Sequence, residues 1–342
     1  MTGKKLTLLV LLLTGVTLLA FAGGEKEAVS GQQEVQKMDF QLNWKITGDH
    51  APYYVALNKG WYEEVGLDVN IIIGQGSGYT VQAVDTGKAE MGIADAPVAV
   101  AGRVKGADVK IVGIIFDKHP NNMFFWKDSG IEEPQDLEGK TVAVPASDGH
   151  KVMWPAFARQ IGIDPDSVDF VNIEPSAKVA ALSSRKADAV FELYTAKPFM
   201  EKAIPADQLG NIIWADYGFD IYAHSYVAHD DVISENPEMV RRFLDATYRA
   251  WEFTLKNPEE AIDILSEYHP INTDDYVANL KAVREFFKTD RYKNRGIGYI
   301  DPERAEATLE VVKKYQGVDV NFTTSEMFDG SFLPDPMYTF DF

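Results

Sequence analysis

The sequence predicts a bilobal α/β protein, with two α/β lobes joined by two crossovers of the chain. Three observations predict this fold class. Helix and strand patterns alternate from residue 38 to residue 228, an order typical of mostly parallel sheets. The hydrophilic stretch 127–140 separates two such sets of elements. After residue 237 the pattern changes to long helical segments, so the chain ends in a helical extension.

Composition agrees with two ordinary domains and excludes several classes of function. The chain has 342 residues, a formal net charge of −19 and no cysteine. An acidic excess this large repels phosphate backbones, so we expect no nucleic-acid partner. The lack of cysteine excludes disulfides, thiolate catalysis, Cys-ligated zinc and a lipid-modified N-terminal cysteine.

The first 22 residues have the three parts of a secretory signal peptide. Lys4 and Lys5 precede an apolar run that ends in the small residues Ala20 and Ala22. The alternative is an uncleaved anchor, because the run is near the lower length limit for a membrane-spanning helix. Residues 23–37 contain almost nothing to bury and predict a flexible tether. We therefore expect a periplasmic or extracytoplasmic protein, secreted via a cleavable signal peptide.

The first alternating set follows the tether. Strands are predicted at residues 38–44, 67–73, 90–94 and 109–116. Apolar residues at helical spacing predict helices at residues 52–65, 79–86 and 97–105. Gly66 ends the first of these helices.

The second set alternates in the same way. Strands are predicted at residues 122–126, 141–144, 168–173, 187–192 and 211–214, with helices at 151–160 and 178–185. One more strand, 222–228, precedes the helical extension. Its helices, at residues 237–255, 258–268, 274–287 and 302–315, each begin with a Pro or an Asp.

These patterns divide the chain after the tether into two lobes. Lobe 1 is predicted to contain residues 38–120 and 217–342, and lobe 2 residues 121–216, with crossovers near 117–126 and 215–222. Two α/β lobes with a late helical extension are the organisation of a bilobal, type II periplasmic-binding-protein fold. Ligand then binds between the lobes, at the carboxyl ends of strands.

Five sequence segments make the resemblance specific. The run 42–69 contains Leu-Asn-Trp followed by a long His-Ala-Pro-Tyr-Tyr segment, and 87–94 reads Gly-Lys-Ala-Glu-Met-Gly-Ile-Ala. Residues 136–142, 186–189 and 236–244 complete the set in order. Together they resemble the ABC-importer substrate-binding proteins of the family that also includes the thiamine-pyrimidine synthases.

The resemblance implies a solute receptor that delivers a small planar heterocycle to an ABC permease and its cytoplasmic ATPase. Ligands in the family include thiamine pyrimidine precursors and riboflavin, and, for more distant relatives, sulfonates and nitrate. We expect a monomer with no catalytic residue, cofactor or metal. The alternatives are a sulfonate- or nitrate-type binding protein and a synthase-like enzyme. The family's synthases are cytosolic and rich in cysteine, which this chain is not.

Candidate ligand-binding residues in lobe 1 lie at strand ends and helix starts. Trp44 offers a flat stacking surface, or is a core residue. His50 opens the first helix, where it could bind a ligand heteroatom or act as a cap, and Tyr53 follows it. Asp95 ends a strand and could face the ligand or cap the next helix.

The Gly-rich loop 74–78 supplies Gly76 and Ser77 as candidates. Glycine turns before helices can hold a polar ligand group with backbone N–H groups, and the alternative is a plain turn.

Candidates in lobe 2 and at the crossovers are chosen in the same way. Ser147 and Asp148 follow a strand, as do Glu192 and Tyr194, and Trp126 lies at the predicted first crossover. Asp220 and Tyr222 lie at the second crossover, with a hinge role as the alternative. An acidic residue such as Glu192 can accept hydrogen bonds from the N–H edge of a heterocycle. The lack of Arg near these positions favours a neutral or cationic heterocycle, and leaves pyrimidine precursor and riboflavin equally open.

Overall fold

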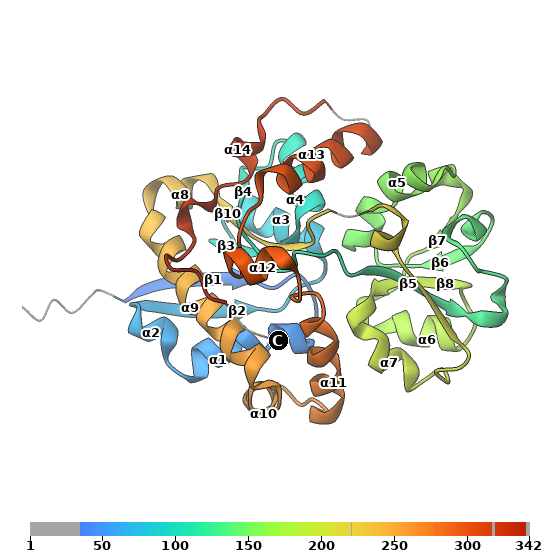
Figure 1. Cartoon of the computed structure of the whole chain (residues 1–342), viewed down its shortest axis with the longest axis horizontal. Helices are drawn as coiled ribbons and strands as arrows, with labels where there is room; N and C mark the ends of the chain where they lie inside the picture. Colours follow the sequence, from blue (N-terminus) through green and yellow to red (C-terminus); the bar gives the residue numbers. More distant parts are fainter. Residues whose placement is uncertain (1–34, 220, 317–318, 340–342) are drawn as a thin grey trace, which may run out of the picture. The chain divides into compact units, whose positions relative to one another are not determined.

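Two five-stranded sheets organise the part of the chain that the structure, a computed structural model, describes: residues 35–219, 221–316 and 319–339 (Figure 1). The strand orders are β2-β1-β3-β10-β4 and β7-β6-β8-β5-β9. The predicted signal peptide, most of the predicted tether and Asp220 lie outside the described residues.

The first sheet combines N-terminal strands with one late strand. Its members are β1 (Gln36–Gln41), β2 (Leu67–Ile72), β3 (Met91–Asp95), β4 (Val109–Ile114) and β10 (His224–His229). Gln36 and Lys37 pair with Leu67 and Asp68 of β2, so the strand begins two residues inside the predicted tether 23–37. That tether prediction was therefore two residues too long.

The second sheet is built from the middle of the chain. Its strands are β5 (Asn121–Trp126), β6 (Thr141–Ala143), β7 (Asp169–Val171), β8 (Ala189–Leu193) and β9 (Leu209–Ile213). The expectation of mostly parallel sheets is confirmed, with one antiparallel strand in each sheet. β5 runs antiparallel to β8 and β9, and β10 runs antiparallel to β3 and β4. Each of these two strands follows a crossover, so it enters its sheet from the edge where the parallel strands end.

Most of the helices belong to the first sheet. They are α1 (Ala51–Asn58), α2 (Trp61–Glu64), α3 (Ser77–Asp85), α4 (Ala96–Val104), α8 (Asp230–Glu235), α9 (Pro237–Lys256), α10 (Pro258–Tyr268), α11 (Thr273–Arg284), α12 (Asp290–Arg295), α13 (Pro302–Gln316) and α14 (Thr324–Met327). The second sheet carries α5 (Gly149–Ile161), α6 (Lys178–Ser183) and α7 (Lys197–Glu201). Below, lobe 1 means the first sheet with its helices and lobe 2 the second sheet with α5–α7.

The predicted helix 52–65 is two helices, α1 and α2. Gly60, at φ +70°, adopts the left-handed backbone that glycine tolerates and that ends a helix. The apolar spacing continues across this break, which is why the sequence pattern suggested one helix.

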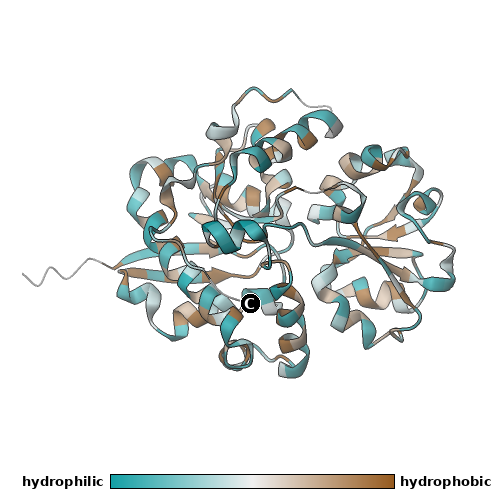
Figure 2. Cartoon of the chain, in the orientation of Figure 1, coloured by the Kyte–Doolittle hydropathy of each residue, from teal (hydrophilic) through white to brown (hydrophobic). Residues whose placement is uncertain are grey.

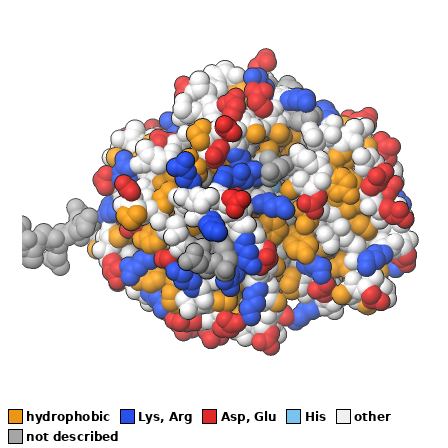
Figure 3. All heavy atoms as spheres, in the orientation of Figure 1, with side chains coloured by type: hydrophobic (Ala, Val, Ile, Leu, Met, Phe, Trp, Pro, Cys, Tyr) orange, Lys and Arg blue, Asp and Glu red, His pale blue; other side chains and the backbone are white. Residues whose placement is uncertain are grey.

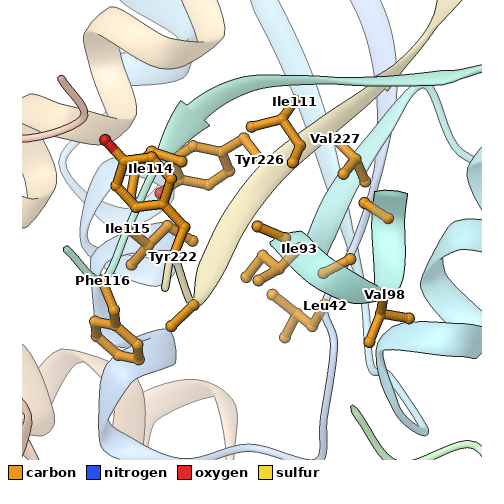
Figure 4. Close-up of a cluster of buried hydrophobic side chains, with 14 of the residues drawn as sticks. Leu42, Ile93, Val98, Ile111, Ile114, Ile115, Phe116, Tyr222, Tyr226 and Val227 are labelled. Carbon is orange, nitrogen blue, oxygen red and sulfur yellow. The ribbon is translucent and has the colours of Figure 1, made fainter. Parts of the chain in front are cut away.

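Buried side chains of both lobes form one large hydrophobic cluster. Hydrophobic residues follow the strands in Figure 2, and Figure 4 shows part of the lobe 1 core around β3, β4 and β10. The cluster continues into lobe 2, where Phe157 and Trp214 stack with ring centroids 4.4 Å apart. A smaller cluster around Phe124 and Leu182 lies in lobe 2 alone.

The chain crosses between the lobes at residues 115–120 and 214–223. Backbone hydrogen bonds join these two segments near lobe 1. The N–H of Ile115 donates to the carbonyl of His224 at 2.8 Å. Asp117 is fully buried there and accepts from Nε of Arg291 at 2.8 Å.

Two properties of the surface and helices bear on function. In Figure 3, Lys and Arg side chains alternate with Asp and Glu over the visible face. Within the described ranges, no helix combines the length and apolar character that crossing a membrane would need.

Candidate functional site

A cavity of about 250 Å³ lies between the two lobes, where β1, β3 and β8 end. Lobe 1 and lobe 2 both contribute to its wall, which includes six predicted residues. These are Trp44, Gly76, Ser77, Asp95, Asp148 and Glu192.

Direct hydrogen bonds join the lobes around this cavity. The hydroxyl of Ser147 donates to the carbonyl of Gln75 at 2.6 Å. Asn279 of α11 accepts from the N–H of Gly48 and donates to the carbonyl of Thr195, each at 2.6 Å. The structure therefore shows the lobes in contact, with the cavity between them.

Two glycines make this approach possible. A Cβ on Gly149, at the start of α5, would lie 2.0 Å from Oδ2 of Asp95. One on Gly76 would lie 2.4 Å from the carbonyl of Ser147, and Gly76 also has φ +123°. At both positions a side chain would push the opposite lobe away.

Lobe 2 lines the cavity with a chain of paired charges. Nζ of Lys178 lies 2.7 Å from Oδ2 of Asp148 and 3.3 Å from Oε2 of Glu192. Asp148 also caps α5 and accepts from Nδ1 of His150 at 2.7 Å. Burial opposes the charges of both Asp148 and Lys178, but their pairing prevails: it lowers the pKa of Asp148 and raises that of Lys178.

Trp44 lies next to this charged chain. Nζ of Lys178 is 4.6 Å from the centroid of the indole, a cation–π contact across the two lobes. Trp44 therefore lines the cavity, as predicted, but lies three residues beyond the end of β1. Lys45 lines it too, and burial lowers its pKa.

Lobe 1 lines the cavity with short polar side chains. Nε2 of His224 lies 3.0 Å from Nδ2 of Asn43 and 3.4 Å from Oδ1 of Asp95. The hydroxyl of Ser77 accepts from the N–H of Asp95 and donates to its Oδ2. Asp95 therefore lies at the end of β3, as predicted, and lines the cavity.

His50 lies behind this wall instead of in it. Its Nδ1 accepts from the N–H of Thr47, and its Nε2 donates to Oδ1 of Asn43, both at 3.1 Å. Burial lowers the pKa of His50, so the ring is neutral at pH 7. His50 therefore holds Asn43 in place and does not face the cavity.

Five other predicted residues do not line the cavity. Tyr53 is buried, with its hydroxyl 3.1 Å from that of Tyr226. Tyr222 is also buried, and its hydroxyl accepts from the N–H of Asp301. Tyr194 packs against Phe286, and Ser147 joins the lobes as described.

Trp126 lies at the far end of β5, because the first crossover ends before Asn121 instead of at residue 126. Its indole N–H donates to the carbonyl of Leu182 at 2.8 Å, and Arg185 covers its ring. We therefore omit Trp126 and these other residues from the candidate site. Asp220 lies outside the described residues.

Several cavity residues were missed by the sequence analysis. The main ones are Asn43, His150, Lys178, His224, Tyr276 and Asn279. Asn43 and His150 are sequence neighbours of predicted residues, which was a usable signal. Lys178 was not detectable, since a lysine that opens a helix is usually solvated and its partners lie far away in the sequence.

A larger hollow, of about 930 Å³, lies among the C-terminal segments from Tyr299 to Met337. No predicted residue lines it, and it is not at the strand ends. Among the residues that the structure describes, no group of three His, Asp or Glu side chains is placed to hold a metal ion.

A family model gives the decisive comparison. The model described as NMT1/THI5 like matches residues 47–261, more than half of the chain. The chain belongs to the NMT1/THI5-like family. This result confirms the family resemblance that the sequence segments indicated. The matched residues include Asp95, Asp148, Lys178 and Glu192 of the cavity wall.

Relatives of this NMT1/THI5-like chain include enzymes and binding proteins. A 4-amino-5-hydroxymethyl-2-methylpyrimidine phosphate synthase from Legionella pneumophila is 26% identical, over 87% of this chain and 92% of that protein. A formylaminopyrimidine-binding protein from Halalkalibacterium halodurans is 23% identical, over 73% and 76%. The riboflavin-binding protein RibY from Chloroflexus aurantiacus is 22% identical, over 97% of both chains.

A solved structure confirms the fold. The periplasmic aliphatic sulphonate binding protein SsuA from Escherichia coli matches with a TM-score of 0.63 at 15% identity, over 85% of this chain and 91% of that one. The predicted periplasmic-binding-protein fold is therefore correct. Fold and relatives together support a solute-binding role.

Proposed function

We propose that the chain is the extracytoplasmic solute-binding component of an ABC importer, and that it acts as a monomer. It captures a small planar heterocycle by closing its lobes and delivers it to a permease. The observation that carries the proposal is the cavity between two lobes, at the carboxyl ends of strands from both sheets.

The charges of the cavity wall favour a neutral or cationic ligand. Four carboxylates line it, those of Asp49, Asp95, Asp148 and Glu192, against two lysines. Lys178 already binds two of these carboxylates, so it has little capacity for a ligand anion. Among the described wall residues there is no arginine. This composition argues against the sulfonate or nitrate alternative.

The size of the cavity favours a single ring. Sites for drug-sized ligands typically measure about 300–1,000 Å³. At about 250 Å³ this cavity is below that range. A substituted pyrimidine fits such a volume better than the three fused rings and sugar-alcohol chain of riboflavin. We therefore propose a thiamine pyrimidine precursor ahead of riboflavin.

We propose binding rather than catalysis, although some relatives are named as synthases. What supports this is the state of the buried lysine and of His50. Lys178 has a raised pKa and is held as a cation by two carboxylates, so it is not a nucleophile at pH 7. Both ring nitrogens of His50 are occupied by protein groups.

Two residues are proposed to contact the ligand directly. The indole of Trp44 stacks on the ligand ring with the face that Lys178 does not cover, and the carboxylate of Glu192 accepts a hydrogen bond from the polar edge of that ring.

Titration calorimetry with 4-amino-5-hydroxymethyl-2-methylpyrimidine, riboflavin and taurine tests both the ligand and the site. We expect Trp44→Ala to weaken heterocycle binding about 5- to 150-fold, since stacking contributes ~1–3 kcal/mol. Binding of taurine alone would contradict the proposed ligand class.

Glu192→Gln keeps the shape but removes a charged acceptor, so we expect a loss of about 10-fold or more. If both variants bind the identified heterocycle as tightly as the parent, the ligand lies elsewhere. Small-angle scattering adds a test of lobe closure, because the radius of gyration should fall when ligand saturates the protein.

Export is also a proposal. We propose that residues 1–22 are removed, as the small residues Ala20 and Ala22 suggest. Intact-mass measurement of protein from the cell envelope tests this. A chain that still carries residues 1–22 would identify the segment as an anchor.

A further inference from the structure

One helix of the C-terminal extension, α11, contacts both lobes. It packs on the turn Gly48–His50 of lobe 1 and on α7 of lobe 2, and Figure 1 shows it at the edge of lobe 1 that faces α7. Tyr276 and Asn279 are three residues apart in α11, so they lie on the same face of the helix, and both line the cavity. This helix therefore joins the lobes directly beside the proposed ligand site.

Asn279 makes the central contact between the lobes. Its side chain is 1% exposed, accepts from the N–H of Gly48 and donates to the carbonyl of Thr195, each at 2.6 Å. A backbone N–H can only donate and a carbonyl can only accept, so these partners fix the orientation of the amide. A Cβ on Gly48 would lie 2.6 Å from Oδ1 of Asn279, so the close approach also needs glycine.

Tyr276 adds a second contact on the same face. Its hydroxyl donates to the carbonyl of Ile46 in lobe 1 at 3.0 Å. Its ring packs edge-on against Phe199 of α7 in lobe 2, with ring centroids 5.4 Å apart. Asp275 pairs with Lys202 of lobe 2, but this lysine is exposed and the pair contributes little. Asn279 and Tyr276 thus carry most of the contact.

The two segments that α11 joins are those that carry the proposed ligand contacts. Ile46 and Gly48 lie in the loop after β1 that also contains Trp44. Thr195 lies three residues after Glu192, in the turn that follows β8. Holding these segments together therefore sets the position of the stacking ring relative to the carboxylate.

We infer that α11 is a latch that holds the two lobes in contact, with Asn279 as its central residue. All contacts of the latch are between protein groups, so it forms without ligand, and part of the free protein has its lobes in contact. Its role in binding rests on the proposed function: the latch must open before ligand leaves. Asn279 is a positioning residue, because it acts through Trp44 and Glu192.

Distances between two spin labels test the latch without any ligand. The chain has no cysteine, so Gln82→Cys in lobe 1 and Ser176→Cys in lobe 2, both at exposed positions, give one defined label pair. We expect the free parent protein to show both a short and a long distance. Asn279→Leu, which keeps the size of the side chain, should lower the ratio of short to long about 10-fold, because contact then leaves Gly48 and Thr195 without a hydrogen-bond partner.

A second variant and a control complete this measurement. Phe199→Leu removes the ring contact with Tyr276 from the opposite lobe, so it should shift the distances in the same direction and decides the test if Asn279→Leu does not fold. Asn58→Leu removes an exposed amide that bonds to Glu267 within lobe 1, and should change nothing. Unchanged distances in both latch variants overturn the inference, as does a free parent protein that shows only the long distance.

Stopped-flow release of 4-amino-5-hydroxymethyl-2-methylpyrimidine and of riboflavin separates the latch from the proposed function. Asn279→Leu should release whichever probe binds about 10-fold faster, with an association rate within about two-fold of the parent. An unchanged release rate overturns the role of the latch in binding. If neither probe binds and the variant still shifts the distances in the free protein, the proposed ligand class fails and the latch stands.

Discussion

The two lobes build their sides of the cavity in different ways. Lobe 1 uses a series of hydrogen bonds that runs from His50 through Asn43 to His224, and Oδ1 of Asp95 has no hydrogen-bond partner. Lobe 2 uses paired charges, with the one cation of Lys178 between the carboxylates of Asp148 and Glu192. Lobe 2 therefore pairs its charges within the protein, whereas lobe 1 leaves one carboxylate oxygen without a hydrogen bond. Four predictions test this difference.

The largest effect is expected when the central cation of lobe 2 is removed. Lys178→Met leaves two carboxylates in the cavity wall without their cation, so the free energy of unfolding should fall by about 3–5 kcal/mol. Denaturant titration measures this change. The control is Lys202→Met, whose exposed ion pair with Asp275 should contribute less than about 1 kcal/mol. Equal losses in the two variants would show that lobe 2 does not depend on the buried pairs.

The next effect concerns the contact between the lobes. Gly149→Ala should force Asp95 away from α5 and weaken ligand binding about 10- to 100-fold, because its Cβ has no room in the closed structure. Gly78→Ala is a matched control, since its Cβ would lie 3.5 Å from the carbonyl of Ser147, an ordinary contact. Small-angle scattering in the presence of ligand should show a larger radius of gyration than that of the parent protein for Gly149→Ala, and an unchanged one for Gly78→Ala. A compact, tightly binding Gly149→Ala protein would contradict the closed geometry.

A third effect is the response of lobe 2 to acid. The folded pKa of Asp148 is below its unfolded value of about 3.9, so the unfolded chain takes up this proton first as the pH falls. The stabilisation is present above about pH 5 and is lost as the pH falls towards the folded pKa. Asp148→Asn should reduce this acid dependence by roughly 1–2 kcal/mol between pH 5 and pH 3. Unfolding curves across this range measure the slope, and an unchanged slope would exclude Asp148 as its source.

The smallest effect separates stability from binding. Trp126→Phe removes the hydrogen bond to Leu182, so it should cost about 0.5–1.5 kcal/mol of stability. Ligand affinity should stay within about two-fold, because Trp126 does not line the cavity. Calorimetry measures this affinity. A change larger than two-fold would show that Trp126 belongs to the ligand-binding site.

Most of the fold was predictable because it depends on local patterns. Alternating apolar runs identified nearly every strand and the long helices, and Asn236 with Pro237 marked the start of α9. The break at Gly60 was missed because the apolar spacing runs through it. The antiparallel direction of β5 and β10 was missed. It depends on the lobe from which the chain enters the sheet, and no local sequence pattern contains that information.

The site was predictable only where a residue's role depends on its position in a strand or loop. Asp95 and Glu192 were found because they lie at strand ends. Tyr53 in α1 and Tyr222 just before β10 were also chosen by their position, but their rings turn into the core, and the sequence does not show that choice. Lys178 and His224 acquire their roles from partners in distant segments.

The position of β10 has a consequence for the order in which the chain can fold. This strand is formed by residues 224–229 and lies between β3 and β4, which are encoded more than a hundred residues earlier. The first sheet therefore cannot be completed until about two thirds of the polypeptide has been synthesised, since the residues of lobe 2 come before β10 in the chain. Such non-local pairing slows folding, because the loop must be ordered before the strands gain their contacts. A newly made chain consequently spends longer without its complete first sheet, which agrees with the export that we propose.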